Sequence, residues 1–374
     1  MKQGYYIVCL DSRGGIYSSG VENKVAMQMK CFSEVFAISL VGIKEIQVSF
    51  WGKVCRRLPY FYTKREYKEA FDQLGEADFI YMRYVPLDKE YMRFIRKIHD
   101  EYPACKIIVE IPTYPYDGEL CALRFFPYLI KDKYYRKEYR KYVDRFVVYA
   151  QNTEEIFGVK TIETMNGIDV KSISPMKTDI EKQKNCIDLI FVGHMQKSHG
   201  LERLIKGLKQ YYQKEQRVKV KFHCVGDGDE RIKYQRLVKR YKLEKSVFFY
   251  GRKTGEELED IYNKCDVAVG VLGFYKVGIK VSSALKSREY LAKGIPIISG
   301  GLTDVFLKDG CDYHIDFPND KSVIDIGEVV SYYQALLIKY GTKNKLAESI
   351  RQYAFEHIDN RIVLEPIISY ISEC

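Results

Sequence analysis

The sequence LKSREYLAKGIPIIS occupies residues 285–299 and is the most informative stretch of the 374-residue chain. It predicts a short helix that ends at Gly294, then a proline and a buried strand, because glycine often ends a helix and proline cannot continue one. Lys286, Arg288 and Glu289 crowd the start of this helix. Cations there add to the positive end of the helix dipole, which disfavours stability but suits a diphosphate, while Glu289 could hold sugar hydroxyls. The alternative is a solvated helix start with a Lys/Glu pair.

Strand-like and helix-like segments alternate on the N-terminal side of this stretch, in two series. We predict strands at 5–10, 36–41, 46–51, 79–84, 106–111, 146–150, 187–192, 218–225, 246–250, 267–271 and 296–299. We predict helices at 21–35, 67–73, 89–101, 201–215, 231–241, 256–264 and 283–293, and a mostly helical end from 321 to 374. This alternation predicts two parallel, doubly wound sheets. Ligands of such sheets bind at the carboxyl ends of strands, so a cleft between the two halves is the expected site.

Composition sets the broad class of the protein. Apolar residues make up 46% and charged residues 29%, which excludes a disordered chain and a disulfide-stapled miniprotein. No apolar run approaches the ~20 residues that cross a bilayer, and no signal peptide is visible, so we expect a cytoplasmic protein. The ten cysteines form no C-x-x-C pair and the six histidines show no H-E-x-x-H spacing, so we expect reduced thiols and no metal site.

The segment 285–299 resembles the donor-site helix of GT-B glycosyltransferases, in particular glycosyltransferase family 4. The family pattern is E-x(7)-E followed by a G-x-P turn, and Glu289 matches the second Glu, which typically binds the ribose of the nucleotide. The first Glu, which lies near the donor sugar, would fall at Val281, so its role cannot be carried over. The form LKSREY is similar to a branch of bacterial polysaccharide-assembly transferases.

Residues 191–205, FVGHMQKSHGLERLI, are similar to the first strand and turn of the family's donor domain. The usual pattern is G-R-L-x-x-x-K-G, whose Arg and Lys bind the diphosphate. Gly193 and Gly200 are kept, but His194 and His199 take the two cationic places, and a neutral imidazole binds phosphate more weakly. Lys197 lies two residues from His199 and could compensate. The alternative is a polar loop without a ligand.

Three further segments follow the family order. Residues 225–230, VGDGDE, resemble the V-G-x-G turn and place Gly226 at the donor. Residues 247–252 resemble the strand before the residues that frame the base, here Gly251 and Arg252. Residues 166–169, NGID, resemble the turn that ends the N-terminal domain.

In the N-terminal half, Gly15 belongs to a glycine-rich first loop that resembles the family loop facing the donor. Residues 110–119, EIPTYPYDGE, follow a predicted buried strand. Strand ends are ligand positions in an α/β sheet, so we predict that Glu110, Tyr114, Asp117 and Glu119 bind the acceptor. A surface turn is the alternative reading.

Residues 131–145 carry seven Lys or Arg against three Asp or Glu, with four tyrosines. As a helix, this stretch suits an anionic membrane surface or a lipid-pyrophosphate acceptor. The alternative is a surface helix whose tyrosines face the core.

The resemblance implies two Rossmann-like domains facing each other across a cleft. We assign residues 1–170 to the acceptor domain, 171–186 to a linker, 187–350 to the nucleotide-sugar donor domain and 351–374 to a helix that packs back on the N-terminal domain. The implied activity is sugar transfer to a glycan or polyprenyl-pyrophosphate-linked acceptor in bacterial capsule, exopolysaccharide or O-antigen assembly, with retention at the anomeric carbon and no required metal or cofactor. In this scheme Lys286, Arg288 and Lys197 neutralise the diphosphate and Glu289 holds the ribose.

Two alternatives remain open at this point. One is a nucleotide-sugar epimerase with the same architecture, and the other is a non-catalytic GT-B partner protein, which the replaced residues His194, His199 and Val281 keep in view. The net charge of +10 also allows nucleic-acid binding, but this is a weaker hypothesis because the positive charge is dispersed along the chain. The sequence does not distinguish a UDP-, GDP- or dTDP-sugar. We expect the chain in the cytoplasm, with a peripheral place on the inner face of the plasma membrane.

Overall fold

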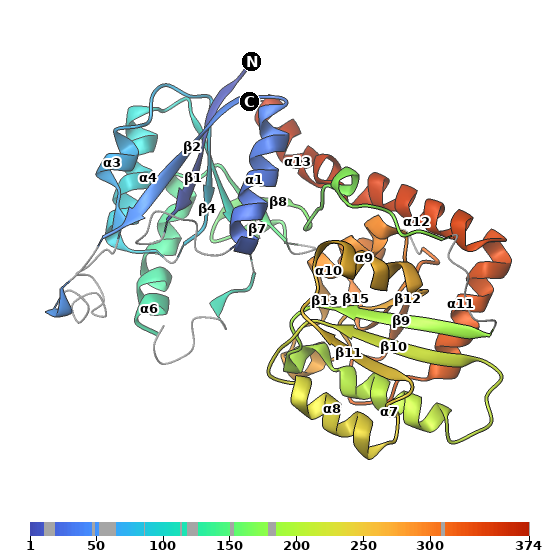
Figure 1. The fold of residues 1–374 in the computed structure, drawn as a ribbon. Helices are drawn as coiled ribbons and strands as arrows, with labels where there is room; N and C mark the ends of the chain where they lie inside the picture. The colour runs from blue at the N-terminus through green and yellow to red at the C-terminus, as the bar shows by residue number, and fades with distance from the viewer. Residues whose placement is uncertain are drawn as a thin grey trace. The chain divides into compact units, whose positions relative to one another are not determined.

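The computed structural model describes residues 1–10, 19–46, 49–51, 65–85, 87–112, 114–117, 126–149, 153–178, 185–307 and 311–373. The chain folds as two compact units. Unit 1 comprises residues 1–165 and 363–374, and unit 2 comprises residues 166–362. Each is an α/β unit built on a mostly parallel sheet, as the alternating sequence pattern predicts (Figure 1).

The sheet of unit 1 has eight strands in the order β3-β2-β1-β4-β5-β6-β8-β7. All neighbours are parallel except the two edge pairs β2–β3 and β7–β8. The strands are β1 Gln3–Cys9, β2 Ala37–Glu45, β3 Arg65–Glu66, β4 Phe79–Arg83, β5 Lys106–Ile111, β6 Arg145–Val148, β7 Glu155–Ile156 and β8 Val159–Glu163. The helices are α1 Ser19–Ser33, α3 Lys68–Phe71, α4 Lys89–Glu101, α6 Phe126–Tyr135, the 3-10 helix η1 Arg136–Lys141 and, from Val363 on, α13 Asn360–Glu373.

Both faces of the β1 strand are buried, which explains its continuous apolar run. Tyr5 and Ile7 pack on one face with the core-facing side of α4, and Tyr6 and Val8 pack on the other with α1 and α13. The C-terminal helix α13 contributes its apolar side chains to that second face, and Lys2 Nζ donates to the carbonyl oxygen of Ile371 at 2.7 Å. The prediction that the end of the chain packs on the N-terminal domain is therefore confirmed.

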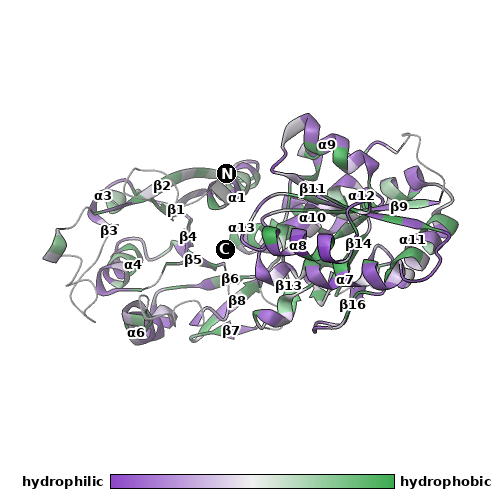
Figure 2. Cartoon of the chain, turned by 60° about the horizontal axis from the view of Figure 1, so that its bottom comes forward, coloured by the Kyte–Doolittle hydropathy of each residue, from purple (hydrophilic) through white to green (hydrophobic). Residues whose placement is uncertain are grey.

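Unit 2 contains a six-stranded parallel sheet in the order β11-β10-β9-β12-β14-β16 and a small parallel pair β13–β15. The strands are β9 Cys186–Val192, β10 Lys219–Val225, β11 Val247–Gly251, β12 Val267–Val269, β13 Val281–Ser282, β14 Ile297–Gly300, β15 Leu302–Thr303 and β16 His314–Phe317. The helices are α7 Leu201–Tyr211, α8 Arg231–Arg240, α9 Gly255–Lys264, α10 Leu285–Lys293, α11 Ile326–Tyr340, α12 Lys343–His357 and the 3-10 helices η2 Val170–Ser172, η3 Lys197–His199, η4 Phe274–Lys276 and η5 Asp304–Phe306. Hydrophilic and hydrophobic residues are mixed along surface helices such as α8 and α11, as expected for helices with one face on a sheet (Figure 2).

Two sequence-based predictions in unit 1 are wrong. The strand predicted at 46–51 is absent from its described residues, and Phe50 and Trp51 are helical and largely exposed. The basic stretch 131–145 is not one helix, because α6 ends at Tyr135 and is followed by η1. Tyr135 and Tyr139 are buried, so two of its tyrosines do face the core. An aromatic-rich stretch can match both the period of a strand and the period of a helix, so its sequence pattern does not determine its secondary structure. Packing in the folded chain does.

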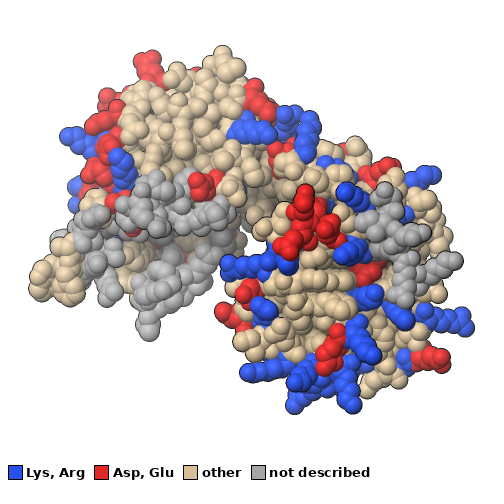
Figure 3. Space-filling view, viewed as in Figure 1, with Lys and Arg blue, Asp and Glu red and all other residues tan. Residues whose placement is uncertain are grey.

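On the face drawn in Figure 3, exposed cations gather on unit 2. Figure 3 shows Lys and Arg side chains over the lower part of that unit, where α8 lies. This helix contributes Arg231, Lys233, Arg236, Lys239 and Arg240 and contains no acidic residue. Within the described residues, no helix combines the length and apolar character needed to cross a membrane.

Candidate functional site

The strand order of unit 2 reverses between β9 and β12. The chain runs from β9 outward to β10 and β11, and then returns to place β12 on the other side of β9. The carboxyl ends of two strands at such a reversal form a crevice that binds ligands in open α/β sheets. The loop after β9 contains Gly193, His199 and Gly200, so these predicted residues lie at this crevice.

Close packing explains the glycines in and beside this loop. Gly200 has φ 63°, and a Cβ there would lie 2.7 Å from the backbone nitrogen of Gly273. A Cβ on Gly226 would lie 2.1 Å from the carbonyl oxygen of Gly193. At Gly193 the nearest atom to an added Cβ is Lys286 Nζ, at 3.2 Å. Two of these glycines therefore let backbones meet, and the third leaves room for an amine.

Helix α10 brings two predicted residues to the same crevice. Lys286 and Glu289 are one turn apart, and the backbone N–H of Val192, at the end of β9, donates to the hydroxyl of Tyr290 on α10 at 2.9 Å. The Lys286 amine lies 2.9 Å from His199 Nε2 and 4.1 Å from the centre of the Phe191 ring. Burial lowers the pKa of Lys286 to about 7, against an opposing effect of the Glu289 carboxylate.

Glu289 accepts a hydrogen bond from the hydroxyl of Tyr262 on α9, with 2.8 Å between the oxygen atoms. Burial is the main reason why the pKa of Tyr262 is raised, and the Glu289 carboxylate adds to it. The tyrosine therefore stays protonated and holds one carboxylate oxygen in place. Tyr262 was missed by the sequence analysis, because nothing in the helical pattern of α9 shows which residue on α10 it meets.

Arg288 is placed differently from its neighbours on α10. Its side chain is fully buried, with an ion pair to Asp304 and a hydrogen bond from Nε to the carbonyl oxygen of Asn166 at 2.9 Å. Nη1 is buried without a partner among the described residues. The diphosphate role of Arg288 stays a prediction, and its observed partners instead give it a structural role within unit 2.

The other predicted donor residues lie around the crevice without joining the contacts above. His194 and Lys197 are exposed. Gly251 ends β11 with φ 68° and open space beside it, and Arg252 is exposed. Val281, in place of the family's first Glu, is exposed on β13. Their roles stay predictions, as does that of Gly15, which lies outside the described residues.

Glu110 lies in unit 1 at the carboxyl end of β5 and is fully buried. Oε1 accepts from Arg83 Nη1 at 2.6 Å and lies 3.5 Å from Lys24 Nζ, and Oε2 accepts from Gln28 and from the Tyr81 hydroxyl, both at 2.7 Å. Burial alone would raise the pKa of Glu110, but the two cations and the hydrogen bonds lower it to about 2. Both oxygens are occupied by protein donors, so this geometry favours a role in holding Lys24 and Arg83 rather than a sugar hydroxyl.

The other predicted acceptor residues are less constrained. Asp117 pairs with Arg136 at 2.7 Å and Lys133 at 3.4 Å, and the Arg136 hydrogen bond is the main cause of its lowered pKa. Tyr114 is partly buried, with its ring centre 6.5 Å from that of Tyr116. Glu119 lies outside the described residues. The acceptor roles of all four stay predictions.

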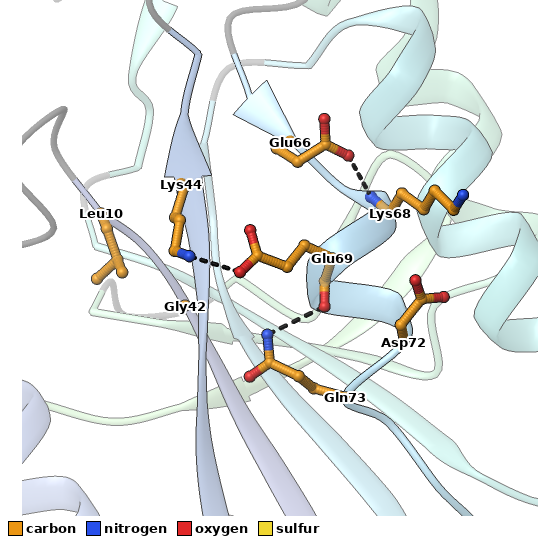
Figure 4. Close-up of a pocket in the computed structure, with 8 residues that line it drawn as sticks. All are labelled: Leu10, Gly42, Lys44, Glu66, Lys68, Glu69, Asp72 and Gln73. Carbon is orange, nitrogen blue, oxygen red and sulfur yellow. Dashed lines mark hydrogen bonds and ion pairs between the residues drawn. The ribbon is translucent and has the colours of Figure 1, made fainter.

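A separate hollow of about 710 Å³ lies at the carboxyl ends of β1 and β2 in unit 1 (Figure 4). Most of the residues that line it are charged or polar, and the Lys44 amine forms an ion pair with Glu69 across it. The backbone N–H of Lys68 donates to Glu66 at 2.9 Å. None of the predicted site residues lines it. Among the described residues, no three His, Cys, Asp or Glu side chains are grouped as metal ligands would be.

Comparison with known proteins identifies the family. Residues 173–328 match the family described as "Glycosyl transferases group 1". A glycosyltransferase from Rickettsia africae ESF-5 superposes with a TM-score of 0.63 at 11% identity, covering 100% of this chain and 98% of that one. The Anabaena protein Alr3699/HepE in complex with UDP has a TM-score of 0.60 at 12% identity, with complete coverage of both chains. The lipopolysaccharide outer core galactosyltransferase WaaB has a TM-score of 0.60 at 12% identity, covering 100% of this chain and 99% of that one.

No curated protein sequence matches the chain significantly. The structural matches establish the fold, and the residues that match the family, 173–328, include β9, α10 and the crevice between β9 and β12. Residues 173–328 are therefore a glycosyltransferase domain of the group 1 family, and the chain as a whole has the GT-B fold.

Proposed function

We propose that the chain transfers a sugar from a nucleotide-sugar donor to a lipid-linked glycan in the assembly of a bacterial surface polysaccharide, with retention and without a required metal. The observation that carries the proposal is the meeting of His199, Lys286 and Glu289 at the carboxyl ends of β9 and β12, inside the segment that matches the family. A related fold binds UDP in HepE, and WaaB is a lipopolysaccharide galactosyltransferase, which supports this class of donor and product.

In this proposal the donor diphosphate binds beside Gly193, where an added Cβ would approach Lys286 Nζ. Lys286, with Lys197 from η3, neutralises the charge that develops on the leaving diphosphate. Glu289 accepts hydrogen bonds from the ribose hydroxyls and is oriented by Tyr262. Gly251 and Arg252 frame the base.

The acceptor binds unit 1. Peripheral contact of unit 1 with the anionic inner leaflet brings this unit to its lipid-linked acceptor. The exposed cations Lys137, Arg140 and Lys141 on η1 and after α6 support this placement. Arg136 does not, because it pairs with Asp117 and Asp132.

The experiment that tests the donor site is a thermal-shift and calorimetry panel of UDP-, GDP- and dTDP-sugars. We expect one base to be preferred, with binding weakened in Glu289→Gln and less so in Tyr262→Phe. Lys206→Gln, an exposed residue on α7, is the matched control and should bind like the wild type. Equal binding by wild type and Glu289→Gln would refute the assignment of the ribose site.

A second measurement separates transfer from epimerisation. With the preferred donor and a crude lipid-linked acceptor extract, the proposal predicts sugar incorporation into the lipid fraction. Release of free epimerised sugar without any acceptor would favour the epimerase, and binding without turnover would favour a non-catalytic partner protein.

A further inference from the structure

His199 stands at the position where the family pattern has a lysine, and the Lys286 amine lies against its ring. The two residues are 87 positions apart, and Nζ and Nε2 are 2.9 Å apart. The His199 ring is buried, and its centre lies 5.0 Å from that of Phe191. The contact is thus a defined pair of nitrogens at the crevice that the proposed function assigns to the diphosphate.

The hydrogen bonds of His199 decide which nitrogen carries its proton. The backbone N–H of Gln196 points at Nδ1 with a distance of 3.2 Å, so Nδ1 is an acceptor and a neutral ring carries its proton on Nε2. An Nε2–H group facing a Lys286 ammonium would place two donors against each other. The pair is therefore satisfied only when Nε2–H donates to a neutral Lys286 amine.

The surroundings support this distribution of protons. Burial, and then the Lys286 amine, lower the pKa of His199 to about 3, so the ring stays neutral at ordinary pH. Glu289 is the charged group on α10 that favours the ammonium form of Lys286, and its carboxylate is already bonded to Tyr262. His194, on the loop after β9, has an exposed side chain whose charge also lowers the pKa of His199, and a hydrogen bond between the His194 backbone and the ring opposes the lowering.

We propose that Lys286 takes up one proton from solvent when a diphosphate binds, and that His199 is the positioning residue that holds the amine neutral and in place until then. A phosphate oxygen offers both donors a common acceptor, so Nε2–H and the new ammonium group point at the ligand instead of at each other. The inference rests on the proposed donor site. It predicts that donor affinity is constant well below pH 7 and falls about tenfold per pH unit above it, until the pH reaches the raised pKa of the bound lysine.

The first test measures the titration of Lys286 in the unliganded chain, so it does not depend on the identity of the donor. Competitive acetylation of the full chain from pH 5.5 to 10, read by peptide mass spectrometry, should give Lys286 a midpoint near 7. His199→Leu, which has no donor, should raise the Lys286 midpoint. His199→Gln, whose amide can donate, should restore a lower one. A wild-type midpoint near 10 would overturn the inference.

The second test measures proton uptake on binding, with UDP-glucose as the probe and then the preferred donor of the panel. Each phosphate of this probe carries one ester and one anhydride link, so neither titrates near pH 7. Calorimetry at pH 8 in buffers of different ionisation enthalpy should show uptake of roughly 0.9 proton per site, as a pKa near 7 requires. Lys286→Arg stays charged and should show none.

The outcomes separate the inference from the proposed function. Donor binding without proton uptake would overturn the inference and leave the donor site standing. Failure of every nucleotide sugar to bind would refute the proposed function, while the acetylation midpoint would still decide the state of the Lys286–His199 pair.

Discussion

A titratable side chain near the end of a strand has opposite surroundings in the two units. In unit 1 the Glu110 carboxylate has donors on both oxygens, and two of them, Arg83 and Lys24, are cations. In unit 2 the Lys286 amine lies against His199, whose available nitrogen is also a donor. A buried charge with all its partners stabilises a fold, whereas a buried amine that faces another donor can become charged only when a ligand supplies an acceptor. The contrast separates a structural cluster from a binding site, although both lie at carboxyl ends of strands.

The largest effect is expected from Glu110→Gln, which leaves two partly buried cations, Lys24 and Arg83, without the charge of this carboxylate. Removing one partner of such a cluster costs about 3–5 kcal/mol of unfolding free energy. Hydrogen exchange of the β4 and β5 amides measures the free energy of opening unit 1 separately from that of unit 2. The control Glu90→Gln, in an exposed ion pair on α4, should change it by less than about 1 kcal/mol. Similar losses of unfolding free energy in the two variants would contradict the structural role of Glu110.

The pH dependence of unit 1 follows from the same cluster. Because the pKa of Glu110 in the folded chain is about 2, below its ordinary value, its stabilisation is fully present above about pH 4.5. It is lost as the pH falls from there through 2. The stability difference between wild type and Glu110→Gln should therefore stay constant from pH 5 upward and shrink in acid.

Binding to anionic liposomes can be used to compare the basic surfaces of the two units. Each Lys or Arg near such a surface contributes about 1 kcal/mol at low salt. Replacing Lys133, Lys137, Arg140 and Lys141 of unit 1 by Gln should strongly weaken binding without changing donor affinity. Replacing Lys233, Arg236, Lys239 and Arg240 on α8 is the matched control. If only the α8 variant loses binding, unit 2 carries the membrane contact, and if wild type ignores the liposomes at low salt, the peripheral proposal fails.

Lys286→Met tests whether the buried amine of unit 2 serves donor binding at a cost in stability. The variant removes a buried amine, so we expect the melting temperature to rise while donor affinity falls roughly ten- to hundredfold, the worth of a charge-assisted hydrogen bond. Lys206→Met on α7 should change neither quantity. Unaltered affinity in Lys286→Met would move the diphosphate site away from this crevice.

Glu289→Ala should lower donor affinity or rate roughly ten- to hundredfold and leave the fold intact, because one carboxylate interaction with a ligand is lost. Steady-state kinetics and melting curves check both parts. Arg288→Ala, one residue away, should instead lower the melting temperature, since its guanidinium pairs with Asp304 inside the fold. Wild-type kinetics in Glu289→Ala would contradict the ribose assignment.

The smallest effect is expected from chelation. EDTA should leave transfer essentially unchanged, because the charge of the leaving diphosphate is assigned to Lys286 and Lys197. Asp227 accepts hydrogen bonds from the Gly228 N–H at 2.9 Å and from Arg231 at 3.3 Å. Loss of activity with EDTA, restored by Mn²⁺ or Mg²⁺, would identify this turn as a metal site.

Local patterns predicted most of the elements. The helix expected at 89–101 is α4 to the residue, because its apolar spacing and the Asp88 cap, which accepts from the Tyr91 N–H at 2.9 Å, agree. The end that was expected to be mostly helical consists of α11, α12 and α13, which are separated near Gly341 and Asp359. The prediction failed at 46–51, where an apolar stretch without a clear period was taken for a strand.

The sequence by itself determined the alternation of strands and helices, the order of the family motifs and the candidate residues His199, Lys286 and Glu289. The alternation depends on short-range chemistry, namely periodicity, helix ends and turns, whereas the motif order and His199 follow from the resemblance of short segments to the family. Only the tertiary structure decided that Arg288 faces Asp304, that Glu110 is enclosed by its own donors, and that Lys286 meets His199. Such contacts join residues that are far apart in the chain, and their energies depend on burial and on the protons of both partners, which no local pattern records.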